Sequence, residues 1–296
     1  MSLVDLPRYQ LHRAATLEEL CQLVYDRVSN SEPVALLAGG TDLMVELGRA
    51  ASPPDPLPLV VDISGMDELR AIEWDGKRIS IGAAVTYLEM QRHPVIAERA
   101  PLIARMARDV GGPTIQARGT LGGNLATASP AADGVAALAA LDGNILVRSA
   151  RGSRRIPMAK LQTGYKQSTR APEEVIVAIE FVPPAPDSPW LWRKVGPRLA
   201  QAISKVALAA VAELEGGKVT RLGLALASVA PVTAQLDHTR ALLSRGDLAA
   251  LDGQALDDAV ESDISPIDDL RSTRAYRLHC AKVLVRSFAR DLGASV

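Results

Sequence analysis

The chain contains few of the residues that most often carry metal or redox chemistry. Its 296 residues include two cysteines, Cys21 and Cys280, which lie far apart in helical patterns. Two thiolates are too few for an iron–sulfur cluster with four cysteine ligands, and they give no disulfide framework. None of the four histidines stands in a ligand spacing with another histidine or a cysteine, so we expect no metal bound by this chain.

Aromatic residues are also scarce, and positive and negative charges nearly balance. Aromatic side chains make up 3% of the chain and the formal net charge is −1, which argues against nucleic acid and anionic membranes as partners. No apolar run approaches the length that crosses a bilayer, and Met1–Gln10 lacks the pattern of a secretory signal. The sequence therefore predicts a soluble, cytoplasmic protein with no membrane span.

The common nucleotide-binding and hydrolase motifs are missing as well. No Gly-x-Gly-x-x-Gly follows a strand pattern, and no Gly-x-x-x-x-Gly-Lys-Ser/Thr occurs, so a Rossmann site has no support and we expect no P-loop. Neither Gly-x-Ser-x-Gly nor His-Glu-x-x-His is present, which removes the common hydrolase classes.

Helix and strand patterns alternate along the first part of the chain, to about residue 172. Thr16, with Glu19 three residues later, is a good N-cap for the first helix. The helix patterns include 16–28 and 94–110, and the strand patterns include 34–38 and 59–63. The proline-rich segment 51–58 predicts a stiff connector.

The second part of the chain has strands followed by helices. Val175–Phe181 predicts a strand, and a hairpin of 202–214 with 219–230 surrounds Gly216-Gly217. Helix patterns follow at 232–244, 247–260 and 267–292. This order predicts an α+β fold, with the boundary between the two parts at 165–174.

Two glycine-rich loops about eighty residues apart are the most unusual feature. The first is Ala38-Gly39-Gly40-Thr41-Asp42-Leu43, and the second is Gly119-Thr120-Leu121-Gly122-Gly123-Asn124. Paired glycines let the backbone approach a ligand closely and aim successive N–H groups at one anion, and a helix beginning at Leu43 adds its positive end. Both loops therefore suit a diphosphate, although a lone Gly-Gly is usually only a turn.

Several further segments, in the same order, resemble the FAD-binding medium subunits of molybdenum hydroxylases of the xanthine dehydrogenase, aldehyde oxidoreductase and carbon monoxide dehydrogenase type. The resemblance covers nearly the whole chain. Besides both glycine loops, it rests on Thr163-Gly164-Tyr165-Lys166, Glu173-Glu174-Val175-Ile176, Lys194-Val195-Gly196-Pro197-Arg198, Ile203-Ser204-Lys205-Val206 and Ser272-Thr273-Arg274-Ala275-Tyr276-Arg277.

The resemblance implies a vanillyl-alcohol-oxidase-like (PCMH-type) FAD-binding domain over 1–172, with lobes at about 1–57 and 58–172. A small α+β C-terminal domain, like that of the carbon monoxide dehydrogenase flavoprotein, would follow over 173–296. Pro197 and Ala200 replace bulkier residues of the family, which predicts a different pocket shape beside the flavin. Tyr165 has two interpretations, a packed aromatic residue or a catalytic acid, and the first is the more common for a Gly-Tyr-Lys near a strand.

The resemblance also implies the residues that bind FAD. In the first loop these are Leu36, Leu37, Ala38, Gly39, Gly40, Thr41, Asp42 and Leu43, and in the second Thr120, Gly122, Gly123, Asn124, Ala126 and Thr127. Asp133 is expected at the ribityl or adenosine end and Ile176 at the adenine or ring system. Lys194 and Ile203 are expected beside the isoalloxazine, where a cation stabilises anionic reduced flavin.

The implied function is electron transfer. A large subunit would hold the molybdenum cofactor and a small subunit two [2Fe-2S] clusters, in a dimer of heterotrimers. This chain would pass electrons from those clusters through FAD to NAD, oxygen or a quinone, with no catalytic side chain of its own. The alternatives are a stand-alone FAD-dependent oxidase and a non-catalytic scaffold subunit.

Overall fold

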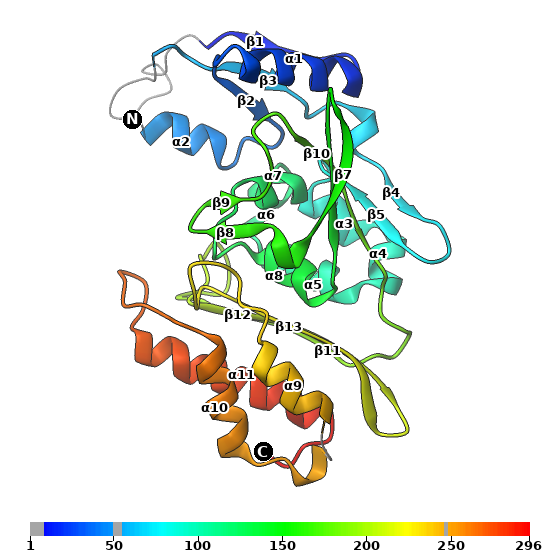
Figure 1. Ribbon diagram of the computed structural model, residues 1–296, viewed down its shortest axis with the longest axis vertical. Coiled ribbons are helices and arrows are strands. Elements are labelled where there is room, and N and C mark those ends of the chain that lie inside the picture. Colours follow the sequence, from blue (N-terminus) through cyan, green and yellow to red (C-terminus); the bar gives the residue numbers. More distant parts are fainter. Residues whose placement is uncertain (1–8, 50–54, 246–247) are drawn as a thin grey trace.

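The computed structural model describes residues 9–49, 55–245 and 248–296. Within this part of the chain a small parallel sheet, a five-stranded antiparallel sheet and a three-stranded antiparallel sheet follow one another along the long axis of the molecule (Figure 1). Residues 1–8, in which a signal pattern was sought, and residues 51–54 of the predicted connector lie outside the described residues.

The first lobe is a parallel sheet in the order β1-β3-β2, covered by one helix. Thr16 caps that helix by accepting a hydrogen bond from the Glu19 N–H at 3.1 Å, as predicted, and its face buries Leu17, Leu20 and Val24. The elements are β1 (Leu11–His12), α1 (Leu17–Ser29), β2 (Val34–Leu37), α2 (Leu43–Arg49) and β3 (Leu59–Asp62).

The middle of the molecule is the antiparallel sheet β4-β5-β10-β6-β7, which α1 of the first lobe also contacts. The strands are β4 (Ile72–Trp74), β5 (Ile79–Gly82), β6 (Asn144–Ser149), β7 (Gly152–Pro157) and β10 (Val175–Phe181). The helices are α3 (Tyr87–Arg92), α4 (Pro94–Arg99), α5 (Pro101–Asp109), α6 (Pro113–Gln116), α7 (Leu121–Ala126) and α8 (Asp133–Ala140). The hairpin β8 (Gln162–Gly164) and β9 (Gln167–Ser168) lies apart from this sheet.

The single helix predicted over 94–110 is two helices. Pro101 begins α5 after a break at Ala100, which has a non-helical ψ of 56°. Proline has no N–H to continue the hydrogen-bond ladder of α4, but it is well suited to the first position of a new helix.

The last sheet, β11-β12-β13, separates two cores. Its strands are β11 (Trp190–Val195), β12 (Val206–Glu215) and β13 (Lys218–Ala227), and the helices beyond it are α9 (Asp237–Arg245), α10 (Gly253–Asp263) and α11 (Arg274–Asp291). Ala207 and Ala209 face the core of the middle region, while Val206 and Leu208 face the α9–α11 core. A Cβ on Gly223 would lie 1.7 Å from the Ala140 carbonyl oxygen, so β13 and α8 are in direct contact.

The strand 175–181, predicted to belong to the second part, pairs with β5 and β6 of the middle sheet. Because these ladder hydrogen bonds tie it to the first part, we propose a boundary in the link between β10 and β11 rather than at 172/173. The helices predicted to begin at 232, 247 and 267 begin later, at Asp237, Gly253 and Arg274. For α10 and α11 the reason is the N-cap, since Asp252 and Thr273 end the preceding extended segments.

Candidate functional site

The first glycine loop connects β2 to α2 and turns at Gly40, where φ is +74°. Within the described residues, the backbone N–H groups from Gly39 to Asp42 donate to no protein acceptor. Backbone amides without a protein partner need water or a ligand. Several of them in one turn, followed by a helix start, form a place for an anion.

Gly39 allows the two loops to touch. A Cβ at this position would lie 1.9 Å from the carbonyl oxygen of Arg118, which directly precedes the second loop. Only glycine lets two backbones come this close. The absence of a side chain at Gly39 therefore positions the second loop against the first.

The second loop is the first turn of α7 and not an open loop. Thr120 caps it, accepting from the Gly123 N–H at 3.0 Å. The N–H groups of Leu121 and Gly122 donate to Val85 and Ala83 carbonyl oxygens at 3.2 and 3.0 Å. The prediction that both loops present free amides is therefore wrong for this loop, because its helical turn and its packing use them.

The two glycines of α7 have different surroundings. A Cβ on Gly122 would lie 2.6 Å from the Cβ and the carbonyl oxygen of Ala83, so this glycine serves packing. Apart from its chain neighbours and the backbone of its own helix, the described atom that a Cβ on Gly123 would approach within 4 Å is the Thr120 hydroxyl oxygen, at 3.0 Å. Gly123 instead lines the cavities described next.

Both loops line one cavity of about 520 Å³. A hydrogen bond of 3.0 Å from the Thr127 hydroxyl to the Asp42 carboxylate joins them across it. Of the predicted binding residues, those on this cavity are Leu36, Ala38, Gly39, Gly40, Thr41, Asp42, Leu43, Thr120, Gly123, Asn124, Ala126 and Thr127. The structure thus brings together two loops that lie about eighty residues apart in the sequence.

A second cavity, of about 220 Å³, adjoins the first and is more apolar. It shares Leu36, Ala38, Gly123 and Ala126 with the larger cavity and adds Gly122 and Ile176. Leu37, which follows Leu36 on β2, lines neither of these two cavities. Alternate residues of a strand point to opposite faces, which explains this difference.

Asp133 and Lys194 form a buried ion pair with Oδ2 and Nζ 2.5 Å apart. Lys194 also donates to the Asp109 carbonyl oxygen at 3.0 Å. Burial raises the pKa of Asp133 to about 6, and the Lys194 ammonium opposes that rise. Lys194, predicted as a cation beside the isoalloxazine, is thus paired with the Asp133 carboxylate within this chain. Neither residue is among those lining the 520 Å³ cavity.

Two buried polar atoms near this site have no partner within the described residues: the Tyr87 hydroxyl, on the 520 Å³ cavity, and Asp133 Oδ1. Burial raises the pKa of the Tyr87 phenol well above its ordinary value, and the carboxylates of Asp133 and Asp42 add to the rise. The phenol therefore keeps its proton. A buried polar group without a partner is costly, and hydroxyl groups of a bound ligand would remove that cost.

The sequence analysis did not name Tyr87, Lys166 or Arg118 as binding residues, although Lys166 stands in a segment that carries the family resemblance. Lys166 lines the large cavity and lies 3.4 Å from the Glu46 carboxylate. The neighbouring Tyr165, for which packing was the more common expectation, is 66% exposed.

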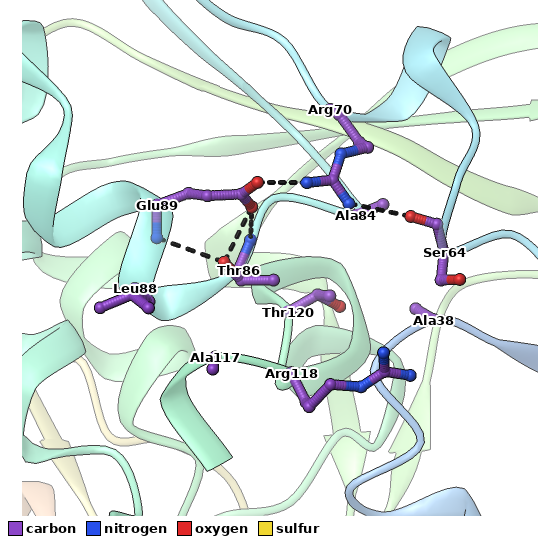
Figure 2. Close-up of a pocket in the computed structure, with 10 residues that line it drawn as sticks. All are labelled: Ala38, Ser64, Arg70, Ala84, Thr86, Leu88, Glu89, Ala117, Arg118 and Thr120. Carbon is purple, nitrogen blue, oxygen red and sulfur yellow. Dashed lines mark hydrogen bonds and ion pairs between the residues drawn. The ribbon is translucent and has the colours of Figure 1, made fainter. Parts of the chain in front are cut away.

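Arg118 extends into a third cavity, of about 390 Å³, beside Ala38 and Thr120 (Figure 2). Its guanidinium has no hydrogen-bond or ion-pair partner in the described chain, whereas Arg70 in the same cavity is paired with Glu89. The sequence offered one sign that Arg118 lies near the site, which is its position directly before Gly119 of the second glycine loop.

Ile203 lies in the segment between β11 and β12 and is 54% exposed. That segment contacts the rim of the large cavity elsewhere, since the Gln201 N–H donates to the Gly111 carbonyl oxygen at 3.3 Å. Val110, which precedes Gly111, lines the cavity. Ile203 itself is not among the lining residues.

Two glycine turns that close on one cavity, between a small parallel sheet and a larger antiparallel sheet, define a site for a dinucleotide. Residues 7–185 match the family model of the FAD binding domain in molybdopterin dehydrogenase. Residues 192–292 match that of the CO dehydrogenase flavoprotein C-terminal domain. The chain therefore belongs to the family of FAD-binding subunits of molybdopterin dehydrogenases, and the predicted family is confirmed.

Relatives with different substrates in their names support this assignment. The putative xanthine dehydrogenase FAD-binding subunit of Escherichia coli K12 is 29% identical over 287 residues, 96% of each chain. The nicotinate dehydrogenase FAD-subunit of Eubacterium barkeri is 31% identical over 201 residues, 67% of this chain and 66% of that one. What these names share is FAD, not the substrate.

A solved structure confirms the fold class. Carbon monoxide dehydrogenase from Hydrogenophaga pseudoflava superposes with a TM-score of 0.89 at 26% identity, covering 97% of this chain and 98% of that chain. Quinoline 2-oxidoreductase from Pseudomonas putida 86, at 24% identity and a TM-score of 0.85, has the same fold. Among the described residues, no helix is both long enough and apolar enough to cross a bilayer.

Proposed function

We propose that this chain binds FAD between its two glycine loops and passes electrons from the [2Fe-2S] clusters of a partner subunit to an external acceptor. The observation that carries the proposal is the set of unpartnered amides from Gly39 to Asp42, within the described residues, on a cavity shared with Gly123 and Thr127. FAD supplies the redox chemistry when bound, because it accepts and releases electrons singly or in pairs. No side chain of this chain is needed as an acid or a base.

The residues present fit FAD. The amides from Gly39 to Asp42 would hold the diphosphate, and Gly123 leaves room for it. The apolar 220 Å³ cavity, with Ile176 on its wall, suits the adenine. The Tyr87 hydroxyl, which is buried on the 520 Å³ cavity and has no partner in the described chain, would bond a hydroxyl group of the cofactor.

Charge points to Arg118 as an additional diphosphate ligand. The large cavity carries the carboxylates of Asp42 and Glu46, and Lys166 is paired with Glu46. A diphosphate needs more positive charge than these residues supply. Arg118, without a partner in the described residues and adjacent to both loops, is suited to provide it because a guanidinium pairs strongly with phosphate.

The predicted partners follow from the same family membership. A relative at 27% identity is named the medium chain of carbon monoxide dehydrogenase, a name that implies other subunits. We propose a large molybdopterin-binding subunit, a small iron–sulfur subunit and a dimer of heterotrimers for this chain. The cytoplasmic location stays a prediction.

Purification of the chain with its partners tests the proposal. We expect flavin absorbance at roughly 450 nm in about stoichiometric amount, and flavin reduction by substrate only when the partner subunits are present. Reduction of the isolated chain by an organic substrate would support the stand-alone oxidase instead. A complex without flavin would support the scaffold.

A further inference from the structure

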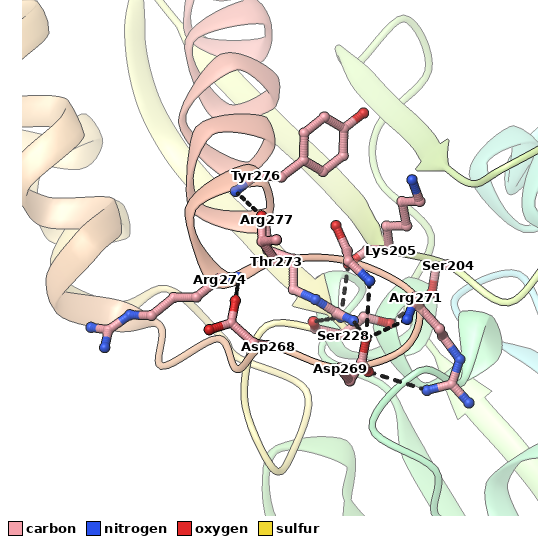
Figure 3. A network of polar contacts seen from close by, with 11 residues as sticks. Ser204, Lys205, Ser228, Asp268, Asp269, Arg271, Thr273, Arg274, Tyr276 and Arg277 are labelled. Atoms are coloured by element: carbon pink, nitrogen blue, oxygen red, sulfur yellow. Dashed lines mark hydrogen bonds and ion pairs between the residues drawn. The ribbon is translucent and has the colours of Figure 1, made fainter.

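A network of polar contacts at the start of α11 centres on Arg277, whose side chain is almost fully buried (Figure 3). Its guanidinium donates to Asp269 Oδ1 at 2.6 Å, to the Ser228 carbonyl oxygen at 2.6 Å and to the Lys205 carbonyl oxygen at 3.1 Å. These acceptors belong to three segments that are separate in the sequence. A single side chain therefore holds all three together.

The first of these segments leads to the cavity rim. Lys205 ends the connection between β11 and β12, in which the Gln201 N–H bonds the Gly111 carbonyl oxygen. The large apolar side chains of this connection are mostly exposed to solvent: Leu199 is fully exposed and Ile203 is 54% exposed. Hydrogen bonds therefore hold this connection more than hydrophobic packing does.

The second segment leads to Asp133. Ser228 has a positive φ of +68°, and its N–H donates to the Pro130 carbonyl oxygen at 2.9 Å. Pro130 lies three residues before Asp133, the partner of Lys194. Ser228 also shares a buried hydrogen bond of 2.8 Å with the Ser204 hydroxyl, so both segments meet at this serine.

We propose that Arg277 is a positioning residue for the flavin. It fixes the connection 196–205 through the Lys205 carbonyl oxygen, and it fixes the segment 128–133 through Ser228, which bonds Pro130. The inference rests on the proposed function. Charged hydrogen bonds inside a protein are stronger than neutral ones, and removing one partner leaves the others buried and unsatisfied. Loss of Arg277 would thus release both segments at once.

The test compares Arg277→Gln with Arg286→Gln in the full chain. Arg286 lies on the same helix and bonds Asp257 at 2.8 Å and the Gly253 carbonyl oxygen at 3.1 Å, but these contacts serve α10 and not the cavity. Three quantities are measured: amide hydrogen exchange of the FAD-free chain, the FAD dissociation constant, and the midpoint potential of bound FAD.

For Arg277→Gln we expect faster exchange in 196–206 and 128–133, an FAD dissociation constant raised about tenfold, and a displaced midpoint potential. Arg286→Gln should lose stability yet keep all three values of the natural chain. A folded Arg277→Gln protein with unchanged exchange, affinity and potential overturns the inference.

If Arg277→Gln does not fold, Asp269→Asn replaces it, because it keeps the shape of the acceptor and removes its charge. We expect the same changes, smaller in size, and their absence overturns the inference equally. A natural chain that binds no FAD would defeat the proposed function instead, and the exchange comparison would still decide whether Arg277 holds both segments.

Discussion

The two glycine loops look alike in sequence, but they meet the cavity with different groups. Among the described residues, the first presents unpartnered amides from Gly39 to Asp42, whereas the amides of Leu121, Gly122 and Gly123 are already bonded within the protein. Paired glycines therefore have two uses here. In the first loop they leave backbone amides without a protein acceptor among the described residues, and in the second they let a helix turn pack closely against Ala83.

The strongest test of this division is Gly123→Val. A side chain at this position would point into space lined by both loops, so we expect FAD affinity to fall by roughly 10- to 100-fold, as overpacking by about 1–3 kcal/mol implies. The FAD-free variant should melt within a few degrees of the natural chain, because among the described residues outside its own helix backbone and chain neighbours a Cβ here meets the Thr120 hydroxyl alone. Flavin fluorescence titration measures the affinity, and full FAD occupancy in the variant would show that the cavity is assigned incorrectly.

Gly122→Ala should have the opposite profile. Its Cβ would lie 2.6 Å from Ala83, so we expect the free energy of unfolding to drop by about 1–3 kcal/mol. The FAD affinity of the folded protein should fall less than in Gly123→Val, because the added Cβ is directed at Ala83 and not into the 520 Å³ cavity. Chemical denaturation together with fluorescence titration checks this, and a selective loss of FAD without loss of stability would remove the distinction between Gly122 and Gly123.

Arg118→Gln tests the charge supplied beside the first loop. Loss of one charge-assisted hydrogen bond predicts an FAD dissociation constant raised by roughly five- to tenfold. Riboflavin, which lacks phosphate, should bind both proteins equally. The control is Arg108→Gln, because Arg108 is exposed and lines none of the three cavities. Equal losses for FAD and riboflavin would argue against a role for Arg118 at the diphosphate.

A further test concerns stability and not FAD affinity, and it uses Asp133 at the start of α8, next to Gly134, whose N–H donates to Asn124 Oδ1 of the second loop at 3.1 Å. Burial raises the pKa of Asp133 from 3.8 to about 6. The folded protein therefore binds more protons than the unfolded chain between these values, and this group makes the protein less stable as pH rises from about 4 to about 6.

Asp133→Asn should remove this contribution. The difference in unfolding free energy between the natural chain and the variant should then change across that pH range and level off above it. Urea denaturation at several pH values measures the difference, and a constant difference would mean that Asp133 keeps an ordinary pKa. The variant also leaves the Lys194 ammonium without its counter-ion, so it should be less stable than the natural chain at pH 7.

Local signals in the sequence predicted much of the fold. The N-cap at Thr16, the apolar runs of β2 and β3 and the helix start at Leu43 depend on neighbours in the chain, and the structure has each of them. Pro101 was as visible as these, but the prediction carried one helix through it. The first strand of the predicted second part belongs to the middle sheet because strand pairing is a long-range contact that periodicity does not reveal.

Short runs of residues with characteristic spacing were enough to identify the family, the cofactor class and the two loops that close on the site. The folded arrangement was needed to show which amides stay free in the described chain and that Lys194 is paired with a carboxylate 61 positions away. It was also needed to show that Tyr87 lines the large cavity, that Arg118 lies in the neighbouring cavity, and that Arg277 joins three separate segments. Each of these depends on which groups from separate segments come within hydrogen-bond distance. Packing sets that distance, and the order of residues along the chain does not show it.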